Sequence, residues 1–156
     1  MKDHFSYGFA SGAIAGLLPL VINLGTRALK LNTLVWADFM GALILGRSPE
    51  ETLESIFLII IQFGFLGLWG GVFALLPPLV TSKRYLFKGA VYGGSLWYVL
   101  FSLPRMFQIP LGSEEIPLKS AVVNLVSALI WGTVMGFIDA FILGYLFGKL
   151  YNRFAE

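Results

Sequence analysis

Cysteine is absent from this sequence of 156 residues, and histidine occurs once, as His4. The chain therefore has no disulfide, no thiol chemistry and no thiolate metal site. One histidine cannot supply paired haem ligands or a metal-ligand cluster, and no Ser/His/Asp grouping can form around it. The glycine-rich stretch Gly67–Gly71 lacks the Lys-Ser/Thr sequence of a phosphate-binding loop. We therefore expect a non-enzymatic protein with no cofactor and no metal site.

Charged residues are also scarce, whereas apolar residues are abundant. Charged side chains make up 13% of the chain, against about 25% in soluble domains. Hydrophobic residues make up 57%, and the mean hydropathy is +0.80. Such a chain cannot cover its surface with polar groups in water, so we expect it to lie in a lipid bilayer. Its Lys and Arg residues are scattered at segment ends, which indicates membrane topology rather than a nucleic-acid partner.

Four apolar stretches are long enough to cross a bilayer, which takes about 20 residues. These stretches are Tyr7–Leu29, Leu53–Leu76, Tyr85–Leu103 and Ala121–Phe147. Pro19 should kink the first, because proline removes a helical hydrogen bond. The predicted fold is an all-α, polytopic integral membrane helical bundle that forms a single transmembrane domain over residues 1–156. The distribution of basic residues predicts that the Lys83–Lys88 loop and the C-terminus lie on the inner side.

A shorter apolar stretch, Leu31–Leu45, follows the first span. Its roughly 15 residues would make about 22 Å of helix, less than the thickness of the hydrocarbon core. We expect a short interfacial or re-entrant helix here. A fifth span is the alternative, and the side on which the N-terminus lies depends on that choice. The next span should begin with Ser48 as its N-cap and Pro49 in its first helical position.

Glycines recur at intervals of four residues in three of the four spans. They are Gly8, Gly12 and Gly16; Gly89 and Gly93; Gly132 and Gly136; and Gly144 and Gly148. Four residues are close to one helical turn, so each set forms a stripe on one face of its helix. Such stripes let membrane helices approach closely. We expect these glycines to be helix-packing residues, either within the bundle or against another subunit.

The two halves of the chain, residues 1–78 and 79–156, contain similar short sequences. Gly12–Gly16 (GAIAG) resembles Gly89–Gly93 (GAVYG), and LWG at 68–70 is matched by IWG at 130–132. With four spans both halves would point the same way, as in a parallel duplication about the membrane normal. Chance resemblance is the alternative, because Gly and Ala are common in membrane helices.

Polar side chains inside membrane spans are costly and are therefore functional candidates. The candidates in this chain are Asn23, Arg27, Asp38, Gln62, Asn124 and Asp139. Arg27 and Asp38 are expected to form an ion pair that holds the short helix against the bundle. The group as a whole could bind a small solute or a lipid headgroup. More often such amides bond neighbouring helices, for about 0.6 kcal/mol each, and we favour that interpretation.

Asp139 is an acid within the last span, far in sequence from any Lys or Arg. Ser11, Tyr92 and Ser95 should lie at comparable depth on other helices. One interpretation is a carboxylate that carries a proton or cation during transport. The other is a structural side chain, protonated or hydrogen-bonded to those hydroxyls, that fixes the helix register. The second interpretation is favoured, because no basic partner accompanies the acid.

Two tryptophans, Trp97 and Trp131, fall near the middle of predicted spans, whereas tryptophan usually lies at the membrane interface. These indoles could line a cavity for an apolar ligand such as a quinone or a lipid chain. The more common role of a tryptophan in this position is to fill space opposite glycine, as dense packing requires. We expect that role here.

The segment LVTSKRYLFKG at 79–89 stands between Asp38-Phe39 and PLKSA at 117–121. With these sequences the chain resembles an uncharacterised family of small polytopic membrane proteins from Gram-positive, spore-forming bacteria. The resemblance implies a bacterial plasma membrane protein with several spans. It implies no activity and no site residues.

Abundant packing glycines and few ionisable groups predict a structural or complex-forming membrane subunit. Its partner would be a second copy of the chain, in a homo-oligomer, or another membrane protein. The alternative function is a small transporter or channel for an ion or small molecule, with Asp139, Gln62 and Asn124 along a polar path. A cavity that reached Asp139 would favour the alternative.

Overall fold

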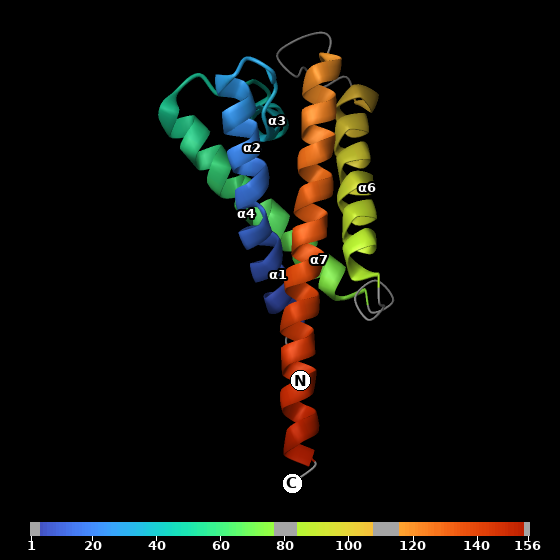
Figure 1. Ribbon diagram of the computed structural model, residues 1–156. Helices are drawn as coiled ribbons and strands as arrows, with labels where there is room; N and C mark the ends of the chain where they lie inside the picture. Colours follow the sequence, from blue (N-terminus) through green and yellow to red (C-terminus); the bar gives the residue numbers. More distant parts are fainter. Residues whose placement is uncertain (1–3, 77–83, 108–115, 155–156) are drawn as a thin grey trace.

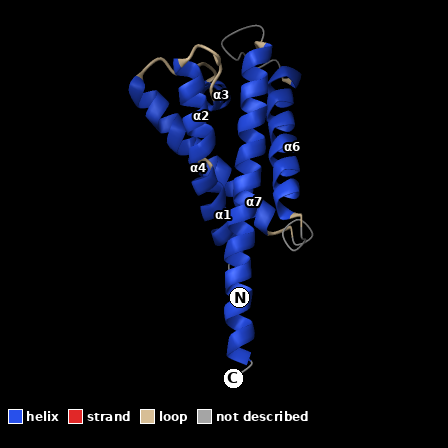
Figure 2. Cartoon of the chain, in the orientation of Figure 1, coloured by secondary structure: helices blue, strands red, loops and turns tan. Residues whose placement is uncertain are grey.

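All regular elements in the described part of the chain are α-helices (Figures 1 and 2). The computed structural model describes residues 4–76, 84–107 and 116–154, with side chains for all of these except 104, 105 and 143–154. The helices are α1 (His4–Ala15), α2 (Leu17–Ala28), α3 (Trp36–Leu45), α4 (Thr52–Ala74), α6 (Tyr85–Met106) and α7 (Leu118–Phe154). The predicted all-α fold is confirmed for these ranges.

Helices α1 and α2 are two parts of one apolar segment, interrupted at Gly16. Pro19 accounts for the interruption, because it has no N–H to donate to the carbonyl of Ala15 and its ring crowds that group. α1 accordingly ends at Ala15, four residues before the proline. The kink expected at Pro19 is present as a break in the helix.

Helix α3 has ten residues, about 15 Å of helix and half the thickness of a hydrocarbon core. It begins at Trp36 rather than at Leu31, because an irregular connection follows α2. It lies beside α2 at one end of the bundle (Figure 1). Its buried residues are Trp36, Asp38, Phe39, Met40, Gly41 and Ala42. The predicted short helix is therefore present, and it is too short to form a fifth span.

The link from α3 to α4 differs from the sequence prediction. Helix α4 begins at Thr52, three residues after Pro49, and no side chain caps its first turn. The side chain of Glu54 instead points back to the link. Its carboxylate accepts the backbone N–H of Glu50 at 2.9 Å and forms an ion pair with Arg47 at 2.6 Å. These contacts hold the link outside the helix. The prediction that Ser48 caps the helix and Pro49 opens it is therefore wrong.

In the described part of the chain, three helical segments are long and apolar enough to cross a membrane, judged by length and composition alone. They are His4–Ala28, which combines α1 and α2, Thr52–Ala74 and Leu118–Ile142. Helix α6 has 22 residues, which is sufficient length, but it carries Lys88 in its first turn and is not among the three. The structure thus supports three of the four predicted spans. Helix α7 has 37 residues, about 55 Å, and continues past the other described helices (Figure 1).

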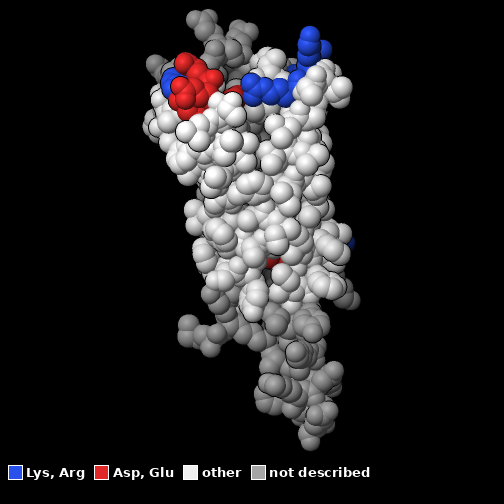
Figure 3. Space-filling view, turned by 90° about the vertical axis from the view of Figure 1, so that its left-hand side faces the viewer, with Lys and Arg blue, Asp and Glu red and all other residues white. Residues whose placement is uncertain are grey.

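The described helices form two pairs. α1–α2 and α4 make one pair, α6 and α7 make the other, and α7 also packs along α1 and α2. α1 begins and α7 ends at the same end of the molecule (Figure 1). Figure 3 shows charged side chains gathered at the opposite end of one face, above a broad surface that carries almost no charge.

Among the described side chains, two clusters of buried apolar residues form the core. The cluster around α3 contains Trp36, Phe39, Met40, Ala42, Leu58, Leu100 and Ala128. The second cluster contains Ala15, Leu66, Phe73, Trp131 and Met135. Each cluster takes side chains from both α4 and α7, so the two helix pairs share one core.

Candidate functional site: a polar seam and a cavity between the helix pairs

Glycines mark the crossing of α1 and α4. A Cβ atom at Gly70 would lie 2.7 Å from Cα of Gly12 and closer still to the carbonyl oxygen of Gly8. Because backbone atoms cannot yield as a flexible side chain can, any residue larger than glycine would push the two helices apart. Gly16 lies against the side chain of Leu66, which is one turn before Gly70 in α4. This glycine stripe therefore packs within the chain.

The crossing of α6 and α7 repeats this arrangement. A Cβ atom at Gly132 would meet the carbonyl oxygen of Gly89 and would lie 3.0 Å from the backbone nitrogen of Gly93. Gly136 lies one turn after Gly132 on α7. A Cβ atom at Gly136 would lie 3.5 Å from Cα of Gly89. In both pairs, one glycine of the later helix lies against two glycines that are four residues apart on the earlier helix.

The glycine contacts and the short sequence match pair different residues of the first half with Gly89 and Gly93 of the second half. The contacts relate Gly8 and Gly12 to Gly89 and Gly93, because these are the pairs that Gly70 and Gly132 contact. The short sequence match had instead related Gly12–Gly16 to Gly89–Gly93. The contacts therefore place the correspondence one helical turn earlier in the first half.

A row of hydrogen-bonding side chains runs along one buried face of α7. Ser120, Asn124, Ser127 and Trp131 follow spacings of four, three and four residues, which places them on one side of the helix. All four are at most 2% exposed, as is Asp139 about two turns further on. This row, here called the polar seam, faces α1, α2 and the irregular connection between α2 and α3.

The upper part of the polar seam binds the α2–α3 connection. Ser120 Oγ accepts the backbone N–H of Thr33 at 3.1 Å and lies 3.1 Å from the Thr33 hydroxyl. Asn124 Nδ2 donates to the carbonyl of Leu34 at 2.8 Å. Backbone groups outside a helix need such partners when they are buried. Ser120 and Asn124 thus provide hydrogen-bond partners for the backbone of an irregular segment that lies inside the bundle.

Asn23 connects α2 to the same network. Its Nδ2 atom donates to the Pro19 carbonyl at 2.9 Å and lies 3.3 Å from Ser127 Oγ. Its Oδ1 atom accepts a hydrogen bond of 3.1 Å from Asn32, whose own Oδ1 accepts the Leu34 N–H at 3.2 Å. The two amides therefore link α7, α2 and the connection into one continuous network.

The ion pair expected between Arg27 and Asp38 is present, with 3.3 Å between Arg27 Nη1 and Asp38 Oδ2. The arginine side chain is 54% exposed and the aspartate side chain 7%. Asp38 Oδ2 also accepts the backbone N–H of Val35 at 3.0 Å, in the first turn of α3. Asp38 is therefore an N-terminal capping residue of α3 as well as the partner of Arg27.

Asp139 joins α7 to α1. Ser11 Oγ lies 2.5 Å from Asp139 Oδ1 and 2.9 Å from the carbonyl oxygen of Gly8. The second carboxyl oxygen, Oδ2, is buried and has no partner in the part of the chain that the structure describes. Of the three hydroxyls expected at this depth, Ser11 is the one in contact. The hydroxyl of Tyr92 instead donates to the carbonyl of Trp69 at 2.9 Å.

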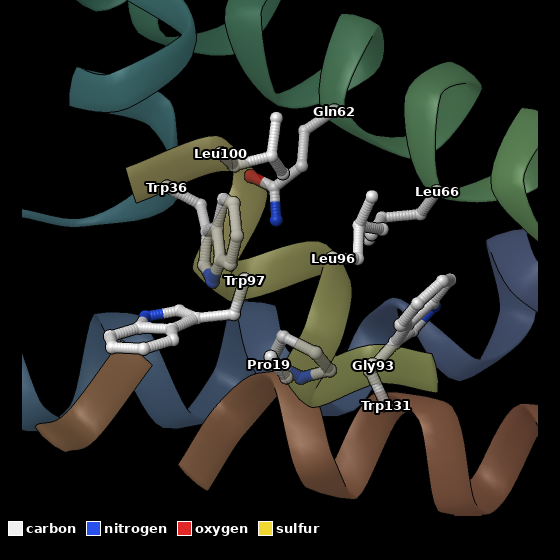
Figure 4. Close-up of a pocket in the computed structure, with 10 residues that line it drawn as sticks. Pro19, Trp36, Gln62, Leu66, Gly93, Leu96, Trp97, Leu100 and Trp131 are labelled. Atoms are coloured by element: carbon white, nitrogen blue, oxygen red, sulfur yellow. The ribbon is translucent and has the colours of Figure 1, made fainter. Parts of the chain in front are cut away.

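A narrow cavity lies between the two helix pairs (Figure 4). Its lining includes Pro19, Trp36, Gln62, Leu66, Leu96 and Trp97, together with residues of α7. Its volume is about 10 Å³, roughly enough space for the centre of one water molecule. Asp139 does not line this cavity.

The two mid-span tryptophans both line the cavity but differ in their hydrogen bonds. Trp131 Nε1 donates to the carbonyl of Gly12 at 2.9 Å, so this indole ties α7 to α1 in addition to filling space. Trp97 Nε1 is buried without a partner among the described residues. The prediction that both tryptophans fill space is therefore incomplete, because Trp131 also forms a hydrogen bond between α7 and α1.

Several members of the network were not predicted from the sequence. They are Asn32, Thr33, Ser120 and Ser127. Serine and threonine are common in membrane helices, and their partners here lie in other segments of the chain, so no local pattern marks them. The one signal available was the spacing of Ser120, Asn124 and Ser127 along a single helix face.

In the described ranges, no group of three or more His, Cys, Asp or Glu side chains is placed to hold a metal ion. No protein-family model, curated protein or solved structure matches this chain.

Proposed function

We propose that this chain is a non-enzymatic, multi-pass protein of a bacterial plasma membrane that serves as a structural or complex-forming subunit. Its four spans would be α1–α2, α4, α6 and α7. Three apolar segments of sufficient length support the membrane location. The close glycine contacts between α6 and α7 support α6 as the fourth span. The resemblance to membrane proteins of spore-forming bacteria supports the choice of membrane.

The main support for this proposal is that buried polar side chains form hydrogen bonds between segments of the chain. The four side chains of the polar seam, Ser120, Asn124, Ser127 and Trp131, and Asp139 further along α7 each contact another segment of the same chain. A transport or catalytic site needs polar groups that are free to meet a substrate. Groups that bond neighbouring helices instead contribute to assembly of the bundle. A structural role therefore agrees best with the seam.

The extension of α7 supplies a surface for a partner. The apolar span of α7 ends at Ile142, whereas the helix continues to Phe154 and passes beyond the other described helices (Figure 1). Gly144 and Gly148, two of the predicted packing glycines, belong to this extension and lie outside the described side chains. The other glycine stripes pack within the chain, so we assign this pair to a second copy or another membrane protein.

The oligomeric state of the protein in nanodiscs tests this assignment. A Gly144→Leu/Gly148→Leu double variant should lose the complexes that the unchanged protein forms, as measured by native mass spectrometry and chemical cross-linking. Gly64→Leu is the matched control, because a Cβ atom at Gly64 has no neighbour within 4 Å. An unchanged protein that is monomeric and co-purifies with no membrane protein would contradict the subunit role.

One observation favours transport as a second candidate function. Asp139 Oδ2 is buried and has no partner among the described residues, and acids in membrane spans are typical of proton and cation pathways. The central cavity, however, does not include Asp139. Proton and cation flux into liposomes distinguishes the two functions. A flux that disappears in a correctly folded Asp139→Asn variant would favour transport over the structural role.

A further inference from the structure

Helix α6 carries an open groove along its first turns, here called the α6 groove. The side chains that line it are Phe87, Lys88, Val91, Tyr92 and Ser95, and its volume is about 270 Å³. Intervals of three or four residues place these side chains on one side of the helix. α6 begins at the end of the molecule at which α1 also begins (Figure 1). The α6 groove therefore extends from that end towards the middle of the bundle.

The α6 groove combines a positive charge with an apolar body. Lys88 lies in the first turn of α6 and is partly buried, whereas Phe87 and Val91 are exposed. Arg84 lies one turn before Lys88 and adds positive charge at the same end. No Asp or Glu is among the described residues that line the groove. The groove is thus positive where the helix begins and apolar further along.

Tyr92 forms a fixed wall of the α6 groove. Its hydroxyl donates to the carbonyl of Trp69 at 2.9 Å, and its ring packs against that of Phe73 with 5.1 Å between the ring centroids. A side chain that is held by α4 in this way cannot turn into the groove and fill it. The space is therefore preformed, as ligand sites usually are.

We infer that the α6 groove binds an anionic phospholipid. Lys88 forms an ion pair with the lipid phosphate, and one acyl chain lies along Phe87, Val91 and Tyr92. The site rests on the proposed function, because α6 must be a membrane span for the groove to lie beside lipid. It adds a lipid partner to the protein partner proposed for the α7 extension.

The order of charge and apolar surface determines the class of ligand. A phospholipid has its charge at the membrane surface and its chains in the bilayer, and the α6 groove runs from Lys88 to apolar side chains in the same order. Anionic headgroups attract basic side chains at the inner surface, which is the side predicted for this end of α6. An ammonium group only donates hydrogen bonds, which suits phosphate oxygens. A soluble phosphate would leave the apolar walls unused.

Photo-crosslinking of the full chain in phosphatidylcholine nanodiscs tests the site. The probe is phosphatidylglycerol with a diazirine in one acyl chain, and mass spectrometry of the peptides locates and counts its adducts. We expect adducts on residues 87–95 that an excess of unlabelled phosphatidylglycerol removes and an excess of glycerol 1-phosphate does not. A phosphatidylcholine probe with the same chain should label these residues about fivefold less, as expected for one basic side chain near the membrane surface.

Variants of the lining separate the charge from the apolar walls. Lys88→Gln should lower labelling by phosphatidylglycerol about fivefold, and Lys88→Arg should retain it. Val91→Trp should lower labelling by both probes, because the larger side chain fills the groove from an exposed position. Lys119→Gln is the matched control, since Lys119 is an exposed lysine in the first turn of α7 and does not line the groove. Circular dichroism checks that each variant keeps its helix content.

Three results would overturn the lipid site. Equal labelling of residues 87–95 by the two probes would indicate ordinary contact with the bilayer. Loss of the adducts in glycerol 1-phosphate would assign Lys88 to a soluble phosphate. Unchanged labelling in Lys88→Gln would remove the role of the charge. In all three cases α6 still contacts lipid and remains a span. An α6 with no adduct from either probe would contradict the fourth span as well, so the two failures are distinguishable.

Discussion

Ser11 and Asp139 connect the first helix to the last through oxygen atoms that lie 2.5 Å apart. Ser11 Oγ also lies 2.9 Å from the carbonyl oxygen of Gly8. A hydroxyl group has one proton, so Ser11 can donate to only one of these two oxygens. If it donates to Gly8, the proton between Ser11 and Asp139 comes from a neutral carboxyl group. The three residues then form an uncharged chain of hydrogen bonds.

Removal of the serine hydroxyl should expose the cost of an unpaired acid. Ser11→Ala leaves Asp139 with no partner among the described residues and should lower the free energy of unfolding by about 1–2 kcal/mol. Ser11→Ala/Asp139→Leu should recover most of the loss, because both polar partners are then replaced. Reversible unfolding in mixed micelles measures both variants. Ser95→Ala, at an exposed position on α6, is the control, and an equal effect there would contradict the prediction.

A neutral amide should replace the acid with little loss. In Asp139→Asn the side-chain N–H takes over the donation to Ser11, so we expect the free energy of unfolding to change by less than about 0.5 kcal/mol. The same micelle unfolding experiment provides the measurement. A loss as large as that of Ser11→Ala would contradict the prediction, because it would mean that the amide does not replace the hydrogen bond between Asp139 and Ser11.

Alanine should have opposite effects at two glycines. Gly132→Ala should destabilise the protein by about 1–3 kcal/mol, since the new Cβ would meet the backbone of Gly89 and separate α6 from α7. Gly64→Ala should stabilise it by up to about 1 kcal/mol, because a Cβ there meets nothing within 4 Å. Chemical unfolding of the two variants side by side tests the sign. Similar effects at both positions would remove the role of Gly132 as a crossing point.

The two partners of the ion pair should differ in importance. Asp38→Ala removes the cap of α3 and should increase amide hydrogen exchange along this helix, at a cost of about 1–2 kcal/mol. Arg27→Ala should cost less than about 1 kcal/mol, because its side chain is 54% exposed and exposed ion pairs contribute little. Hydrogen exchange with mass spectrometry gives both values. The reverse order would show that the charge of Arg27, rather than the cap, holds α3.

The indole hydrogen bond of Trp131 can be compared with an indole that has none. Trp131→Phe should be about 1 kcal/mol more destabilising than Trp69→Phe, because only Trp131 donates a bond, to the carbonyl of Gly12. Both substitutions remove a similar volume. Thermal unfolding in nanodiscs followed by circular dichroism measures the difference. Equal losses would mean that packing alone explains the contribution of Trp131.

Helix positions were predictable because a bilayer requires each spanning segment to satisfy its own backbone. Tyr7–Leu29 and Leu53–Leu76 agree with α1–α2 and α4 to within a few residues. The first turn of α4 was not predictable, since the side chain of Glu54 bonds to the preceding link instead of leaving Ser48 to cap the helix. Helix ends depend on such local competition between alternative hydrogen bonds.

Partners across the bundle were much harder to predict. The spacing of Gly8 and Gly12 predicts a stripe, but nothing in the sequence identifies Gly70 as the residue that it meets. Ser11 was one of three hydroxyls expected near Asp139, and depth alone could not select it. Such choices depend on the rotation of each helix about its axis, which the sequence determines only through the packing of the whole bundle.

The contacts of α7 with α1 and α2 have a consequence for biosynthesis. Ser11, Asn23 and the carbonyl of Gly12 bond to α7, which leaves the ribosome long after the helices that carry them. Until α7 is inserted, α1 and α4 can join through their glycines, but these polar groups lack their final partners. The half-made protein is therefore an open intermediate, and the insertion of α7 is the step that closes it.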